Sequence, residues 1–404
     1  MAELLIRASS QDAALLRRIY GLDGRRAVAA QPSRIVVDAH VPVSSRGDGL
    51  LAAVRQAGVP LLIDPQTFYL QGGQYAGDPW AGLPFGRPSK SLPGDFDAFA
   101  QEDLIARVVD YQLEHGATSI IPPYVHIEKI ASEWIDVQAG FWERTRRYLD
   151  RNGVSLPVSA VLALGWRVLH PVQGPAALAP IFEAMAILNP QEIALAASKA
   201  DQGVNPRDRA MDFVLMIERL RHHHPVIAWQ QGHLGELSVA AGGVGYECGI
   251  AWREKCDLQT AMGNRQKPAS GGPGARPVFV PALGRSIPKR SLEAIRENRD
   301  LWMRVICPDD ECCQAGGMTL LGDARAHAIV QRATRLSELD RIERPVWRWQ
   351  HLAEKADEGI DLARRINRLA RTVPAITEVS TGALVATSAV SHTRRIDIRS
   401  RRVA

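Results

Sequence analysis

Two carboxylates stand in apolar segments where an unpaired charge would be costly. Glu247 lies within the β-rich run 244–250, and Asp64 follows the apolar residues Leu-Leu-Ile in the segment 59–70. Burying a carboxylate without a partner is unfavourable, so each side chain needs a partner or a chemical role. Two carboxyl groups at one site can act together, one as nucleophile and one as acid/base. Alternatively, one of them is held by an arginine or by backbone amides and only braces the fold.

A second candidate for chemistry is a group of cysteines that follows the last predicted strand. Cys307, Cys312 and Cys313 lie in a Gly-containing turn region, and His327 lies in the first turns of the following helix. Three thiolates and one imidazole form a complete tetrahedral ligand set for structural Zn²⁺. The alternative is a pair of buried thiols beside an unrelated histidine. Five cysteines in a chain expected to be cytoplasmic favour thiols or metal over disulfides.

The elements that must position these residues alternate regularly between strands and helices. Repeated βα units predict an α/β fold, and eight of them favour a closed (β/α)8 barrel, or TIM barrel, over an open sheet. Parallel strands bring their carboxyl ends to one mouth, so Asp64 and Glu247 should meet there. The predicted strands are 34–43, 59–70, 118–127, 158–166, 192–198, 226–230, 244–250 and 277–284.

The pattern divides the chain into four predicted parts. Residues 1–33 form an N-terminal capping segment, 34–300 the barrel, 301–335 a Cys/His zinc-binding subdomain, and 336–404 a C-terminal helix with a basic tail. The Gly- and Pro-rich loop 71–94 follows the strand that ends on Asp64. A loop of this length predicts a mobile lid over the barrel mouth.

Composition narrows the class of protein further. No run of about 18 apolar residues occurs, so we expect no membrane-spanning helix. The N-terminus has charged residues among its apolar positions and lacks the apolar core of a signal peptide, which predicts a cytoplasmic protein. The net charge of +5 is compatible with a nucleic-acid partner, although a solvated basic tail explains part of the excess equally well. A homodimer is left open.

Three segments together resemble the tRNA-guanine transglycosylase family, zinc-bearing (β/α)8 barrels that exchange a base in nucleic acid. LLIDPQTF, residues 61–68, resembles that family's strand end ILTDSGGF. The stretch 233–254 is similar to the family segment that ends in a strand of the type FDC, and Glu247 stands at the position of its Asp. The cysteine group stands where the family has CxCxxC and a distant His. The resemblance covers roughly residues 55–335.

The resemblance implies a role for several residues. It makes Glu247 the nucleophile, Asp64 an acid/base that also contacts the base, and Phe68 the aromatic residue that stacks on the base. The sequence departs from the family where Ser-Gly-Gly is replaced by Pro65-Gln66-Thr67 and where Tyr124 and two prolines replace a base-reading Asp. The nucleophile is also longer by one methylene group, and the cysteine spacing differs.

The leading hypothesis is therefore a transglycosylase-like enzyme that acts on a purine-like base in tRNA or DNA. Tyr124 and Trp229 could add stacking to that of Phe68. Arg253 and Arg265 could bind phosphate, as could Lys267 and Arg276, unless they are ordinary surface charges. Two alternatives remain open. One is a flavin- or deazaflavin-dependent oxidoreductase or a small-molecule glycosidase on the same barrel, and the other is a non-catalytic relative that binds nucleic acid.

Overall fold

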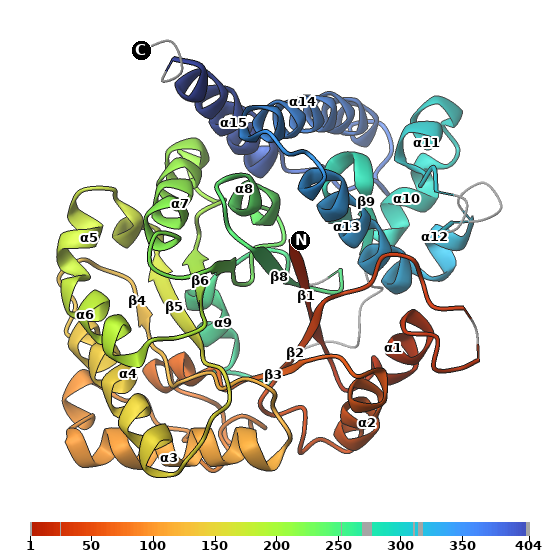
Figure 1. The fold of residues 1–404 in the computed structure, drawn as a ribbon. Coiled ribbons are helices and arrows are strands. Elements are labelled where there is room, and N and C mark those ends of the chain that lie inside the picture. Colours follow the sequence, from red (N-terminus) through yellow and green to blue (C-terminus); the bar gives the residue numbers. More distant parts are fainter. Residues whose placement is uncertain are drawn as a thin grey trace.

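The computed structural model describes residues 2–24, 26–251, 253–268, 277–309, 312–313 and 318–400. Its centre is one curled sheet of eight parallel strands with helices packed around it (Figure 1). The strands are β1 (Glu3–Ala8), β2 (Arg34–Asp38), β3 (Leu61–Asp64), β4 (His126–Ile127), β5 (Ser159–Gly165), β6 (Glu192–Ser198), β7 (Val226–Ala228) and β8 (Gly245–Gly249). Their order is β3-β2-β1-β8-β7-β6-β5-β4. The predicted α/β class and a TIM-barrel-like arrangement are confirmed.

The segment that precedes β4 links the two edges of this sheet. Thr118 donates its backbone N–H to the carbonyl of Leu61 on β3 over 2.9 Å. Ile120 donates to the carbonyl of Pro157, just before β5, over 2.8 Å. These hydrogen bonds place main chain between β3 and β5 and make the sheet curl.

The strand register collects charged side chains at the carboxyl ends of the strands. Residues of β5 and β6 are buried throughout, as expected for parallel strands that are covered on both faces. Elsewhere polar residues interrupt the apolar runs near their ends. Asp38 on β2 lies opposite Asp64 on β3, and Arg7 on β1 lies opposite Gly249 on β8.

The predicted number of strands was right, but one predicted member was wrong and one strand was missed. The sheet includes residues 3–8, which the sequence analysis placed in a capping segment. It does not include the predicted last strand 277–284. There, β9 (Val278–Val280) pairs antiparallel with β10 (Arg285–Ile287) in a separate two-stranded sheet. An apolar run indicates a strand but not its partner, and this one packs against the C-terminal helices.

The helices fall into two groups. In the first, all helices but the last connect successive strands of the sheet, and the last follows its final strand; the second group is formed by the C-terminal part of the chain. The first group comprises α1 (Ala13–Ile19), α2 (Gly47–Ala57), α3 (Ala98–Glu114), α4 (Trp134–Arg151), α5 (Gln173–Ala177), α6 (Ala179–Leu188), α7 (Pro206–Leu220), α8 (Gly235–Ala240) and α9 (Leu258–Asn264). The second comprises α10 (Lys289–Ile295), α11 (Arg299–Val305), α12 (Met318–Gly322), α13 (Ala324–Asp340), α14 (Pro345–Ala370) and α15 (Gly382–Ser400). Among the described residues, no helix is both long and apolar enough to cross a membrane.

The predicted lid, residues 71–94, is anchored by its aromatic side chains. Trp80 is fully buried, and its indole N–H donates to the carbonyl of Pro65 over 2.8 Å. Phe85 packs edge-on against Trp80 in the main core. The backbone of Tyr75 donates to the carbonyl of Arg265, so the segment lies beside the loop that follows β8. Closure of this segment over a ligand stays a prediction.

Candidate active site and metal centre

One buried arginine gathers three carboxylates at the carboxyl ends of neighbouring strands. Arg7 on β1 contacts Glu247 on β8 (Nε to Oε1, 3.0 Å) and Asp64 on β3 (Nη2 to Oδ2, 2.9 Å). It also contacts Asp38 on β2 (Nη1 to Oδ1, 2.6 Å). The four strands are adjacent in the sheet, so their ends must converge on one point. We call Arg7, Asp38, Asp64, Glu247 and Arg253 the mouth cluster.

The predicted pair Asp64 and Glu247 is thus brought together, with Arg7 between the two side chains. Glu247 also accepts a hydrogen bond from the backbone N–H of Gln230 over 2.9 Å. Asp64 accepts from the hydroxyl of Tyr124 over 2.9 Å. Both carboxylates are 0% exposed. Their hydrogen bonds match the bracing alternative, and their catalytic roles stay predictions.

The mouth cluster carries more negative than positive charge. Its three carboxylates face two guanidiniums, because Arg253 also contacts Asp38 (Nη1 to Oδ2, 2.6 Å). Burial raises the pKa of Glu247, and the charge of Arg7 opposes this rise. Burial also acts to raise the pKa of Asp38, but Arg253 and Arg7 outweigh it and hold this pKa well below its usual range. The formal charge of the cluster is therefore one unit negative when all groups are ionised.

Two cavities open beside the mouth cluster. The smaller, about 200 Å³, is lined by Arg7, Asp38 and His40. The larger, about 400 Å³, is lined by Phe68 and Tyr69 together with polar side chains of the loops after β3, β7 and β8. Arg253 lines both cavities. Asp64 and Glu247 are fully buried and line neither cavity.

Backbone strain is concentrated at the same end of the sheet. Of the six non-glycine residues with positive φ in the described part of the chain, five lie in loops that follow strands. The exception, Asn189, ends helix α6. A left-handed residue other than glycine costs roughly 1–3 kcal/mol and is retained mainly at functional sites. The five are Gln66 after β3, Lys199 after β6, Gln230 after β7, and Ala251 and Arg253 after β8.

The predicted aromatic contacts lie around the cluster and are buried. Phe68 lines the larger cavity, and its ring centre is 5.7 Å from that of Tyr124. Trp229 lies against Arg7, whose guanidinium carbon is 5.3 Å from the ring centre. Tyr124 is 1% exposed and Trp229 is 0% exposed, so neither presents a free face for stacking in this conformation.

The predicted cations are divided between the cavity wall and the surface. Arg253 binds Asp38, and Arg265 forms an ion pair with Asp78 (2.7 Å) while its guanidinium stacks over Tyr69 at 4.4 Å. Both arginines line the larger cavity. Lys267 is exposed. The predicted phosphate ligand Arg276 lies outside the described residues.

Sequence reasoning missed three residues at this site: Arg7, Asp38 and His40. Arg7 interrupts the apolar run of β1, and Asp38 ends the apolar run of β2. This is the same signal that identified Glu247 and Asp64. Arg7 was overlooked because its segment was assigned to a cap outside the barrel.

The four predicted metal ligands also come together. One donor atom from each of Cys307, Cys312, Cys313 and His327 lies within 4.8 Å of the other three. His327 Nε2 is 2.8 Å from the carbonyl of Phe279, and its Nδ1 is 3.2 Å from Cys313 Sγ. A carbonyl partner at Nε2 fixes the proton there and leaves Nδ1 free to bind a metal, as is usual for metal-ligating histidines. The group can therefore hold a metal ion.

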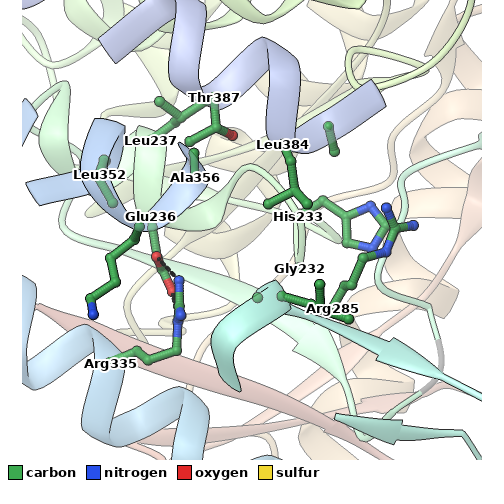
Figure 2. Close-up of a pocket in the computed structure, with 14 residues that line it drawn as sticks. Gly232, His233, Glu236, Leu237, Arg285, Arg335, Leu352, Ala356, Leu384 and Thr387 are labelled. Atoms are coloured by element: carbon green, nitrogen blue, oxygen red, sulfur yellow. Dashed lines mark hydrogen bonds and ion pairs between the residues drawn. The ribbon is translucent and has the colours of Figure 1, made fainter. Parts of the chain in front are cut away.

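A third buried polar region lies between the sheet and the C-terminal helices (Figure 2). Glu236 of α8 points toward Arg335 of α13 and forms an ion pair with it (2.7 Å). His233 Nδ1 lies 2.8 Å from Asp201, and Glu254 is bound by Arg332. We call these six residues the interface network. The cavity beside it is small, about 40 Å³.

Comparisons with known proteins assign no family to this chain. No family model matches it, and no curated protein matches it. One similar solved structure is orotidine 5′-monophosphate decarboxylase from Sulfolobus solfataricus. The two sequences are 13% identical, and the match covers 66% of this chain and 96% of that chain with a TM-score of 0.34. So distant a match supports no conclusion about function.

Proposed function

We propose that this chain is a transglycosylase-like enzyme on a closed (β/α)8 barrel, which breaks the glycosidic bond between a purine-like base and its sugar in tRNA or DNA. The main support is the mouth cluster, where three carboxylates meet two guanidiniums. Cleavage of a glycosidic bond builds up positive charge on the sugar. Carboxylates that are fixed in position before the substrate binds stabilise that transition state.

In this proposal Glu247 and Asp64 divide the work between them. The carboxylate of Glu247 attacks C1′ of the sugar, and the bond from C1′ to the base nitrogen breaks. Its electron pair leaves with the base, which takes a proton from the carboxyl of Asp64. A second base or a water molecule then attacks C1′, returns a proton to Asp64 and releases Glu247. The Tyr124 hydroxyl, 2.9 Å from Asp64 Oδ1, orients this carboxyl.

The proposed attack requires Arg7 to leave Glu247 when substrate binds. Arg7 already contacts Asp38, and both residues line the smaller cavity. A short movement of the guanidinium toward Asp38 would therefore keep one carboxylate partner while it frees Glu247. The positive-φ residues Gln230 and Arg253 lie in the loops that border this path.

The larger cavity supplies the binding contacts of the proposed substrate. Phe68 and Tyr69 offer aromatic surface for the base, and Arg253 and Arg265 offer guanidiniums for phosphate. Trp80 of the adjoining loop packs edge-on against Tyr69, which lines this cavity. Ligand-induced closure of residues 71–94 would then shield the reaction from water.

We further propose that the metal is a structural Zn²⁺ bound by Cys307, Cys312, Cys313 and His327. Four protein ligands fill a tetrahedral shell, so the ion would take no part in the reaction. His327 lies on α13 and the three cysteines lie between α11 and α12 in the chain, so the ion would tie α13 to that segment.

A second candidate is a non-catalytic relative that binds nucleic acid. The specific observation in its favour is that Asp64 and Glu247 are both 0% exposed and both bound to Arg7. In that case the carboxylates would orient Arg7 and brace the mouth.

One experiment separates the two candidates. Wild-type protein and Glu247→Gln are incubated with tRNA and with DNA, and base release and covalent adducts on denaturing gels are measured. If the enzyme proposal is right, the wild type forms an adduct. Glu247→Gln forms none, and its turnover falls by orders of magnitude. The exposed Glu293→Gln serves as the matched control. Binding without base release or adduct in the wild type would favour the non-catalytic relative.

A further inference from the structure

A tryptophan at the mouth of the sheet is contacted by two arginines. Trp166 directly follows β5, and the guanidinium carbon of Arg209 lies 3.8 Å from its ring centre. The guanidinium of Arg167 lies 4.5 Å from the same ring centre. Trp166 is partly exposed, in contrast to the buried Trp229. We call Trp166, Arg167 and Arg209 the Trp166 clamp.

The clamp lies at the same end of the sheet as the mouth cluster. Gly165, the last residue of β5, pairs with Ser198, the last residue of β6. Arg209 of α7 reaches back to the loop after β6, where it donates a hydrogen bond to the carbonyl of Gln202 over 2.7 Å. That loop begins with Lys199, which has a φ of 62°. The clamp is therefore built on the carboxyl ends of β5 and β6.

A short series of contacts connects the clamp to the larger cavity. Arg209 also lies 3.4 Å from the carbonyl of Lys199. The ammonium of Lys199 lies 3.7 Å from Asp257 and 2.8 Å from Gln259. Asp257 and Lys255 line the larger cavity. A ligand that extends from this cavity along Lys255 and Lys199 would meet the clamp next.

The charges of the clamp are incompletely matched. Arg167 forms an ion pair with Glu128 (3.0 Å), but no carboxylate of the described residues forms an ion pair with Arg209. Burial lowers the pKa of Arg209, and the neighbouring charge of Arg167 lowers it further. Two guanidiniums lie against one aromatic ring, and among the described residues only that of Arg167 has a carboxylate partner, so one positive charge of the clamp is unmatched.

We propose that the Trp166 clamp binds a phosphodiester of the nucleic-acid strand next to the base that enters the larger cavity. The ring of Trp166 holds the two guanidiniums in place, and guanidinium geometry matches phosphate oxygens. The reacting base reaches the cavity from a single strand or after it is flipped out of a duplex. This inference rests on the proposed function and adds a contact to a neighbouring nucleotide.

The test measures how binding depends on salt. Fluorescence anisotropy follows the binding of labelled single strands and duplexes, as RNA and as DNA of one sequence, over a series of salt concentrations. Because Arg167 has a side chain that is 54% exposed, Arg167→Gln should fold normally. It should reduce the slope of log affinity against log salt by about 0.7 for single strands, the value for one lost phosphate contact. Trp166→Leu should reduce it too.

The matched control is Arg151→Gln, an exposed arginine in the last turn of α4, at the opposite end of the barrel. Its slope should equal that of the wild type. The clamp is refuted if Arg167→Gln keeps the wild-type slope or if Arg151→Gln loses as much. The RNA and DNA arms identify the preferred polymer, since a phosphate contact is lost in both.

Glu247→Gln, measured in parallel, separates this inference from the proposed function. It should keep the wild-type salt slope and lose base release. If the wild type releases no base but Arg167→Gln lowers the slope, the proposed reaction fails and the clamp stands. If base release occurs and Arg167→Gln leaves the slope unchanged, the clamp fails and the reaction stands.

Discussion

The mouth cluster and the interface network are both groups of charged side chains inside the protein. They differ in how completely the charges are paired and in the volume of the adjoining cavities. In the interface network each carboxylate has its own cationic or imidazole partner: Arg335 for Glu236, Arg332 for Glu254 and His233 for Asp201. In the mouth cluster Arg7 is shared by three carboxylates, and the second guanidinium, Arg253, contacts Asp38 alone. The cavities beside the mouth cluster are about 200 and 400 Å³, whereas that beside the network is about 40 Å³.

This difference shows which property of buried charge indicates a functional site. A matched ion pair is explained by its own contacts and stabilises the packing of two elements. A buried charge without a full set of partners, next to a cavity, is unfavourable, and binding of a ligand or a proton can lower its free energy. The positive-φ residues support this distinction, because Gln66, Gln230 and Arg253 line the larger cavity.

The largest expected effect is that of removing the metal ion, which should affect the interface network and not the mouth cluster. Helix α13 carries His327 as well as Arg332 and Arg335, so loss of the metal should loosen the interface network and leave the mouth cluster in place. Structural zinc contributes about 10 kcal/mol or more to the folding of small domains. Cys313→Ser should therefore abolish zinc binding and lower amide protection in α13 by orders of magnitude.

Elemental analysis and hydrogen exchange measure these two outcomes. Cys256→Ser, at a buried cysteine outside the metal group, is the control and should keep about one zinc per chain. Equal loss of protection in β1–β3 and in α13 would contradict the separation of the two regions.

The next effect compares one arginine from each region. Arg7→Met leaves the buried Glu247 and Asp64 without their cation, and removal of one partner from a buried ion pair costs about 3–5 kcal/mol. Arg335→Met should cost less, about 1–3 kcal/mol, because the side chains of Arg335 and Glu236 are 18% and 21% exposed. Urea unfolding measures both values. Equal losses would show that Arg7 contributes no more to the unfolding free energy than Arg335 does.

The meeting of Asp64 and Glu247 could be predicted from the sequence, because a carboxylate near the end of an apolar run indicates a strand end. Their common partner could not. The run 3–8 was assigned to a capping segment, and its place between β2 and β8 is set by long-range pairing. The omission of this strand was offset by the inclusion of 277–284, so the count of eight was right although its members were not.

The metal group was also accessible to sequence reasoning, since four suitable ligands lie close together in the chain. The carbonyl of Phe279 that orients His327 was not, because it comes from a strand 48 positions earlier. The Trp166 clamp was missed for the same reason. Arg167 is adjacent to Trp166 in sequence, but Arg209 reaches the ring only through the pairing of β5 with β6.

The smallest effect concerns the pH dependence of stability, where the two regions should respond in opposite directions. Burial raises the pKa of Glu247 in the fold above the value of about 4.3 for an unfolded glutamate. Protonation of Glu247 therefore stabilises the fold as the pH falls from neutral toward about 4.3. Burial acts to raise the pKa of Glu254 as well, but Arg332 and His233 outweigh it and lower this pKa far below the usual range. Its contribution is full above about pH 4.3 and is lost as the pH falls further.

Glu247→Gln and Glu254→Gln test these signs by urea unfolding at a series of pH values. The unfolding free energy of the wild type minus that of Glu247→Gln should increase as the pH falls from about 7 to about 4.3. The corresponding difference for Glu254→Gln should stay level over that range and decrease below it. Each unit of pKa shift is worth about 1.4 kcal/mol, so the two curves are separable by equilibrium measurements. Parallel curves would mean that the buried charge of the mouth cluster is as well matched as that of the interface network, and the main support for the proposed reaction would be lost.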